Sequence, residues 1–142
     1  MAPPKITRKK VAAYSASTLD VDVKVAPYFL EKESTPEDSI YVWGYKVVIH
    51  NRRQHPITLR SRYWKITDGL GQIQEVQGQG VVGKQPVIEP DGHFDYTSGA
   101  PLGTPSGIMY GHFIMHESTG DVFSVNAPAF SLDSPYQKQT LN

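Results

Sequence analysis

The pattern of apolar side chains is the feature that most limits how this chain can fold. In a segment that begins near Ser17, apolar residues at 19, 21, 23 and 25 alternate with polar ones. A period of two indicates a β-strand with one buried face and one wet face. No segment keeps apolar residues at helical spacing for more than two turns without an interior proline or glycine. The sequence therefore predicts many short strands.

Turn-forming residues divide the chain at regular intervals, since its 12 glycines and 11 prolines lie between short apolar stretches. We expect strands at 17–25, 40–51, 57–67, 72–77, 87–89, 93–98, 108–116 and 122–130, with loops that include 31–39, 78–83 and 99–107. The fold class that this predicts is all-β, an immunoglobulin-like or fibronectin type III-like β-sandwich of about seven to eight strands. Six large aromatic residues are expected in its core: Trp43, Tyr45, Tyr63, Trp64, Phe113 and Phe123.

The domain boundaries follow from composition. Residues 1–16 are rich in proline and lysine and predict a flexible basic arm, 17–132 form the sandwich domain, and 133–142 are a polar tail. The chain has no cysteine, which excludes disulfides, thiolate catalysis and thiolate zinc sites. With 14 acidic and 14 basic residues, it has no bulk charge with which to bind nucleic acid. No stretch approaches the roughly 20 apolar residues of a membrane helix, and no apolar region typical of a secretory signal follows the basic N-terminus.

Six short blocks occur in a fixed order along the chain: YVWGY at 41–45, SRYWKITD at 61–68, GQGVVG at 78–83, YTSG at 96–99, TPSG at 104–107 and PAFSL at 128–132. Together they strongly resemble the bacterial ApaG family over about residues 17–132. The resemblance implies a fibronectin type III-like sandwich in a cytoplasmic protein. Eukaryotic proteins with this domain imply an interaction module, and bacterial members are associated with cobalt and magnesium phenotypes. The family often has Glu where this chain has Gln79, which weakens a metal role for that loop.

The block at 78–83 also has the spacing G-x-G-x-x-G, formed by Gly78, Gly80 and Gly83. Such glycines can let backbone N–H groups approach a phosphate closely. A dinucleotide fold would need a helix directly afterwards, and Pro86 and Pro90 prevent one. Two interpretations remain, a pyrophosphate-binding loop and a tight connection whose glycines allow positive φ, and the second is favoured.

Histidines and arginines supply the other candidates. His50 and His55 flank a turn at 51–54 and are weak candidates for a metal site, because two imidazoles alone hold an ion poorly. On a strand, His112 and His116 would lie ~13 Å apart, too far to share a zinc ion.

Arg60, Arg62 and Trp64 would share one strand face by alternation. This face is interpreted either as a surface for anions or acidic peptides, or as a structural one. In the structural alternative, Arg62 pairs with Asp95 or Glu75 and Trp64 packs in the core.

No catalytic constellation is present, such as a Gly-x-Ser-x-Gly elbow, so we expect no enzyme activity and no cofactor. The leading hypothesis is a non-enzymatic binding domain that mediates protein–protein interaction. The alternative, from a different class, is a sensor of pyrophosphate-type ligands or of the divalent cations Mg²⁺ and Co²⁺. Its site would be the loop of Gly78, Gly80 and Gly83, with Arg60 or Arg62 nearby.

Overall fold

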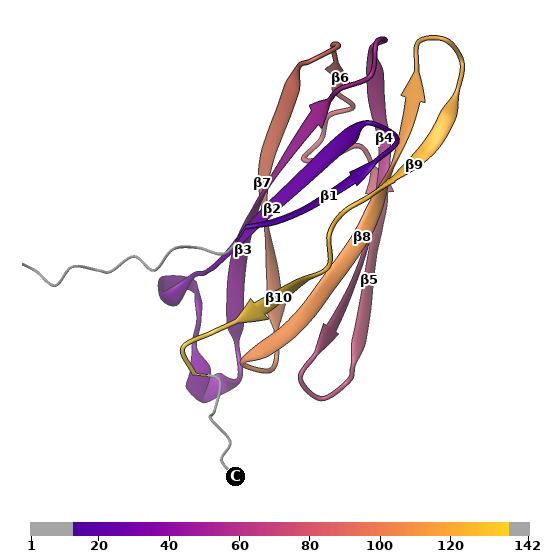
Figure 1. The fold of residues 1–142 in the computed structure, drawn as a ribbon. Coiled ribbons are helices and arrows are strands. Elements are labelled where there is room, and N and C mark those ends of the chain that lie inside the picture. Colours follow the sequence, from indigo (N-terminus) through magenta and orange to yellow (C-terminus); the bar gives the residue numbers. More distant parts are fainter. Residues whose placement is uncertain (1–12, 137–142) are drawn as a thin grey trace, which may run out of the picture.

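Two antiparallel β-sheets stack on one another in the computed structural model, which describes residues 13–136 (Figure 1). The first sheet has the order β1 (Tyr14–Thr18), β2 (Val21–Phe29), β3 (Tyr41–Asn51) and β7 (His93–Leu102). The second has the order β10 (Phe130–Asp133), β8 (Ser106–Glu117), β4 (Ile57–Asp68) and β5 (Ile73–Gln79), while β6 (Val87–Ile88) pairs with β4 and β9 (Val122–Asn126) with β8. Two short 3-10 turns, η1 (Glu31–Glu33) and η2 (Pro36–Asp38), precede β3. The predicted all-β sandwich is confirmed, with ten strands where about seven to eight were expected.

The core lies between the two sheets and follows the predicted alternation. On β2, Val21, Val23 and Val25 are fully buried. Trp64 of the six-stranded sheet packs edge-on against Tyr45 of the other sheet, with ring centroids 5.6 Å apart. Fully burying a large apolar side chain contributes roughly 1.5–3 kcal/mol relative to leaving it exposed, so these inward faces hold the sheets together.

Four of the six predicted core aromatics are buried, namely Trp43, Tyr45, Trp64 and Phe113. The prediction is wrong for Tyr63, which is half-buried on the outer face because it is adjacent to the inward-facing Trp64 in the strand. Phe123 is only partly buried and packs beneath the guanidinium group of Arg53, 4.4 Å from its ring centroid.

The segment predicted as one strand from Ser17 is a hairpin. Leu19 and Asp20 adopt positive φ angles of 48° and 65° and form the turn between β1 and β2, which leaves Leu19 exposed. The sequence signalled no turn there, because neither residue is glycine. Residues 14–16, predicted to belong to the arm, are part of β1, and residues 1–12 lie outside the described residues.

Two further boundaries differ from prediction. The expected loop at 99–107 is mostly strand, since β7 continues through Gly99 and pairs with β3 as far as Leu102. The predicted polar tail begins as structure: Asp133 ends β10, and the Tyr136 ring lies 6.0 Å from that of Phe29. Residues 137–142 lie outside the described part. Within 13–136, no helix is long and apolar enough to cross a bilayer.

Candidate functional site

The outer face of the six-stranded sheet carries an unusual share of exposed apolar side chains. Register places Thr67 of β4 between Ile73 of β5 and Ile108 of β8. Ile73 is 55% and Ile108 52% exposed, and Tyr110 in the next row is 42% exposed. Large apolar groups that remain in water on one continuous face are typical of interaction surfaces.

Tyr63 lies on the same face. Its ring stacks on that of His112, with centroids 5.1 Å apart. Its hydroxyl donates a hydrogen bond to Oε2 of Glu75 at 2.6 Å, and this bond raises the pKa of Tyr63 to about 12. The ring is thus held by one partner on β8 and another on β5, and its hydroxyl stays protonated at neutral pH.

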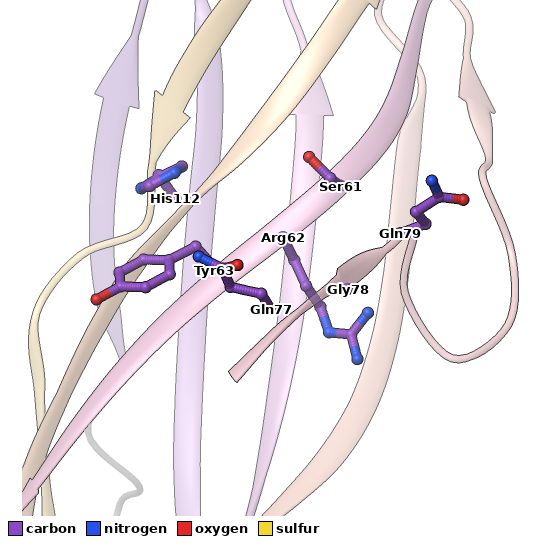
Figure 2. Close-up of a pocket in the computed structure, with 7 residues that line it drawn as sticks. All are labelled: Ser61, Arg62, Tyr63, Gln77, Gly78, Gln79 and His112. Carbon is purple, nitrogen blue, oxygen red and sulfur yellow. The ribbon is translucent and has the colours of Figure 1, made fainter. Parts of the chain in front are cut away.

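A shallow groove of about 470 Å³ runs beside Tyr63 (Figure 2). Its lining comes from β4, β5 and β8: Ser61, Arg62, Tyr63, Gln77, Gly78, Gln79 and His112. Figure 2 shows the Arg62 side chain extending toward the strand that carries Gly78, while Tyr63 and His112 point the other way. The groove therefore has the Tyr63 and His112 rings at one end and the Arg62 guanidinium group near the other, at the β5 edge.

The outer face of the four-stranded sheet is different in kind, because its side chains form ion pairs. Lys46 Nζ lies 3.4 Å from Asp95 Oδ2. Arg52 donates from Nε to Asp22 Oδ2 at 2.9 Å, and hydrogen bonds from Arg52 and then Ser17 lower the pKa of Asp22 to about 2. Most charges on this face are thus paired with one another; the exposed Lys24 of β2 is in none of the ion pairs of the described residues.

The structure does not pair the two predicted metal-ligand histidines. His50 stacks on His93, with ring centroids 4.1 Å apart, and its Nε2 lies 2.9 Å from Asp91 Oδ1. His55 is exposed in the turn, where its carbonyl oxygen accepts a hydrogen bond from the buried Asn51. In the described part of the chain, no three His, Asp or Glu side chains are grouped to hold a metal ion. Sequence reasoning missed His93, because its place beside His50 depends on the β3–β7 register.

The expectation that Arg60 shares a face with Arg62 and Trp64 is wrong. A β-bulge shifts the β4–β8 register between Leu59 and Ser61, so Arg60 is the extra residue. Arg60 is exposed and donates a hydrogen bond to the Gln85 side chain.

Arg62 is half-buried, and neither predicted carboxylate is its partner: Asp95 pairs with Lys46, and Glu75 accepts from Tyr63. Its Nη1 donates instead to the carbonyl oxygen of Gly80 at 2.8 Å.

The predicted glycine loop divides into a strand and a turn. Gly78 is inside β5, opposite Arg62. Gly80 has φ +63°, its N–H donates to the carbonyl oxygen of Arg60, and a β-carbon there would lie 2.0 Å from the carbonyl oxygen of Lys84. The N–H of Val81 donates to that same oxygen. The glycines thus have conformational roles, and an anion would have to compete for these N–H groups.

Comparisons with known proteins identify the family. The sequence profile of the ApaG domain matches residues 31–117. The chain belongs to the ApaG family. Protein ApaG of Agrobacterium fabrum is 54% identical over 129 residues, which are 91% of this chain and 99% of that protein. Protein ApaG of Sinorhizobium fredii is 52% identical over the same shares.

A similar solved structure agrees with the fold. The crystal structure described as that of an ApaA protein from Bordetella pertussis has a TM-score of 0.79 and 43% identity. The match covers 82% of this chain and 94% of that chain. The names of these ApaG relatives specify a family and no activity, so function has to be argued from the surface.

Proposed function

We propose that this ApaG-family chain is a non-enzymatic binding domain that docks another protein on the outer face of its six-stranded sheet. The contrast between the two outer faces carries the proposal. One face pairs most of its charges with one another, as in Lys46–Asp95. The other leaves Ile73, Ile108 and Tyr110 in water.

The composition of the exposed face suits a protein partner. Interface centres are depleted in charge and rich in tyrosine and other large side chains, because these bury much area at a small desolvation cost. In the row next to Tyr63, Lys65 of β4 lies directly opposite Glu75 of β5, so their charges oppose each other, and Lys65 Nζ lies 5.8 Å from the Tyr110 ring centroid. We expect the part of the partner that covers Ile73, Ile108 and Tyr110 to be apolar and to offer pockets for the Tyr63 and Tyr110 rings.

The state of Tyr63 supports binding over catalysis. A tyrosine that acts as a general base or nucleophile needs a pKa lowered toward the working pH. Here the hydrogen bond to Glu75 raises the pKa of Tyr63 to about 12, and the hydroxyl is already engaged. The groove then offers a rigid aromatic contact. The proposal also includes a cytoplasmic location, in keeping with the cysteine-free sequence, and a fibronectin type III-like or immunoglobulin-like strand arrangement.

The second candidate function, a sensor of pyrophosphate-type ligands, is supported by one specific observation. Arg62 and the exposed Arg60 lie on β4 beside the glycine segment 78–83, where Arg62 Nη1 donates a hydrogen bond to the Gly80 carbonyl oxygen. These guanidinium groups would attract a pyrophosphate-type ligand. It ranks second because the Gly80 and Val81 N–H groups have backbone acceptors.

Site-specific photo-cross-linking tests the proposal. A benzophenone amino acid would replace Tyr110 on the proposed face, or Thr97 on the charged face as the control, in protein expressed in Agrobacterium fabrum. We expect one discrete protein adduct from position 110 and none from position 97. Equal labelling from both positions, or no protein adduct from position 110, would contradict the proposal.

A further inference from the structure

The β5 strand is an open edge of the six-stranded sheet. All its residues are exposed except the half-buried Gly78. In an antiparallel pair, alternate residues bond the neighbouring strand, and the others direct their N–H and C=O groups away from it. Two hydrogen bonds show that the even-numbered residues of this segment face β4: Gly80 N–H donates to the Arg60 carbonyl, and Asp68 N–H donates to the Gln72 carbonyl. The outward groups therefore belong to residues 73, 75, 77 and 79.

Both edge strands of the four-stranded sheet, β1 and β7, carry protective features. Along β7, Pro101 has no N–H, its carbonyl oxygen accepts a hydrogen bond from Gln74, and Asp95 adds a charge. At β1, Thr18 Oγ1 accepts a hydrogen bond from Asn126 N–H of β9. Natural sheets protect edges with proline, charge or a covering strand. The β5 sequence IQEVQGQ has no proline and no lysine, and the carboxylate of its one acid is bound by Tyr63.

Arg62 places an unneutralised charge behind this edge. Its guanidinium lies over Gly78, where a β-carbon would be 2.8 Å from Nη1. In the described part of the chain, no carboxylate lies within ion-pair distance of it. A strand added beside β5 would be two strand spacings from β4, roughly 9–10 Å. The long Arg62 side chain covers much of that span, because Gly78 leaves its path open.

From the free edge and this charge, we propose that β5 binds an extended segment of a partner protein as an added strand, with a carboxylate of that segment bound to Arg62 across Gly78. A side chain opposite Gly78 points to the same side of the sheet as Arg62. The backbone pairing supplies affinity, and the carboxylate–guanidinium pair selects an acidic residue at one position. The inference rests on the proposed function and names the kind of segment that the partner contributes.

A second copy of this chain fits the edge less well. If two β5 strands paired, the side chains facing Arg62 would be Gln74, Val76 or Gly78, the inward positions of the strand. Glu75, the one acid of β5, points to the outer face and is bound by Tyr63. Self-pairing would therefore leave the Arg62 charge unmatched.

Synthetic peptides test the inference on the intact chain. The probe is the capped heptapeptide Thr-Val-Thr-Asp-Thr-Val-Thr, and its control has Asn in place of Asp. With its Asp opposite Gly78, the heptapeptide spans residues 75–81, so we expect it, at millimolar concentration, to slow hydrogen exchange at the amides of 75, 77 and 79, with little change at 74, 76 and 78. The Asn peptide should bind about three- to tenfold more weakly, the range for a partly exposed charge-assisted pair.

Variants separate the two contacts. Gln77→Pro removes an outward N–H without breaking the bonds to β4 and should abolish binding, whereas Gln77→Thr keeps the N–H and should bind like the wild type. Arg62→Gln should equalise the Asp and Asn peptides. Loss of the alternating pattern, equal affinity of the two peptides for the wild type, or protection that rises with protein concentration without peptide would overturn the inference.

The same data distinguish the two proposals. If the Tyr110 position gives a protein adduct while neither peptide protects β5, the docking face stands and strand addition is wrong. If the peptides bind β5 while the Tyr110 position gives none, the edge is a binding site and the docking face is wrong.

Discussion

The guanidinium group of Arg62 lies over Gly78 of the neighbouring strand, at a point where a β-carbon would come within 2.8 Å of Nη1. The first glycine of the G-x-G-x-x-G spacing thus makes room for an arginine. The second, Gly80, permits a turn with φ +63° beside the Lys84 carbonyl. The spacing typical of a phosphate-binding loop therefore has two separate steric causes here: space for the Arg62 side chain at Gly78 and a positive φ angle at Gly80.

The turn glycines should differ sharply in their tolerance of alanine. Gly80→Ala puts a β-carbon 2.0 Å from the backbone oxygen of Lys84, whereas nothing lies within 4 Å of one at Gly83. Both positions have positive φ, which alone costs roughly 1–2 kcal/mol. We expect Gly80→Ala to lower the free energy of unfolding in urea by at least about 2 kcal/mol more than Gly83→Ala, since backbone must move. Equal losses would contradict the turn geometry.

Pyrophosphate should leave this turn unchanged. The Gly80 and Val81 N–H groups donate to the Arg60 and Lys84 carbonyl oxygens, so they are not available to an anion. In an amide-resolved NMR titration, we expect no saturable shift at Gly80 or Val81. Saturation below ~1 mM, a binding free energy beyond about −4 kcal/mol, would instead support the anion sensor. Arg60→Gln should then weaken that binding, and its lack of effect would mark the shifts as non-specific.

The hydroxyl of Tyr63 should ionise at a higher pH than that of an ordinary tyrosine. The hydrogen bond to Glu75 raises the pKa of Tyr63 to about 12, and the Glu75 charge adds to the rise. Glu75→Gln removes the charge, so the pKa of Tyr63 should fall toward the ordinary value of 10.0. NMR of ¹³C-labelled tyrosine rings would measure it, with Glu89→Gln as the control. An unchanged titration in Glu75→Gln would exclude the hydrogen bond.

Acid should remove the stabilising effect of Asp22. Its pKa is lowered from 3.8 to about 2 by hydrogen bonds from Arg52 and Ser17. A carboxyl group whose folded pKa is depressed stabilises the fold above its unfolded pKa and loses that contribution as pH falls through the folded value. The stability gap between wild type and Asp22→Asn, at most about 1 kcal/mol for a screened pair, should therefore close between pH 3.8 and 2.

Urea unfolding at each pH would measure this gap. Asp38→Asn, on the exposed turn η2, is the matched control, because Asp38 is in none of the ion pairs of the described residues. A gap that widens in acid would contradict the ion pair.

Much of the fold could be predicted because β2 and β3 show their alternation in local sequence. Three features could not. The turn at Leu19 uses positive φ without a glycine. The bulge at Arg60 is hidden within a regular run of basic and apolar residues. The composition around Gly99 predicts a loop, but Gly99 belongs to a strand because it pairs with the distant Gly44 of β3.

The candidate site was only partly predictable. The sequence indicates Arg62 as a candidate. The alternation of side chains along β4 places Trp64 inside and Tyr63 outside, so this alternation alone predicts that Tyr63 lies on the outer face. The contact of Tyr63 with His112 could not be predicted, because it depends on the β4–β8 register after the bulge. The free edge of β5 likewise depends on knowing that the sheet ends there.

The most direct test of the account is the affinity of the cross-linked partner, purified and titrated calorimetrically against two double variants. Tyr63→Ser with Tyr110→Ser alters the proposed docking face, and Lys24→Ser with Lys46→Ser alters the charged face. We predict that the first pair weakens binding at least about tenfold, as expected for aromatic residues at an interface centre, and that the second leaves it within about twofold. Loss of binding from the charged-face pair alone would contradict the account.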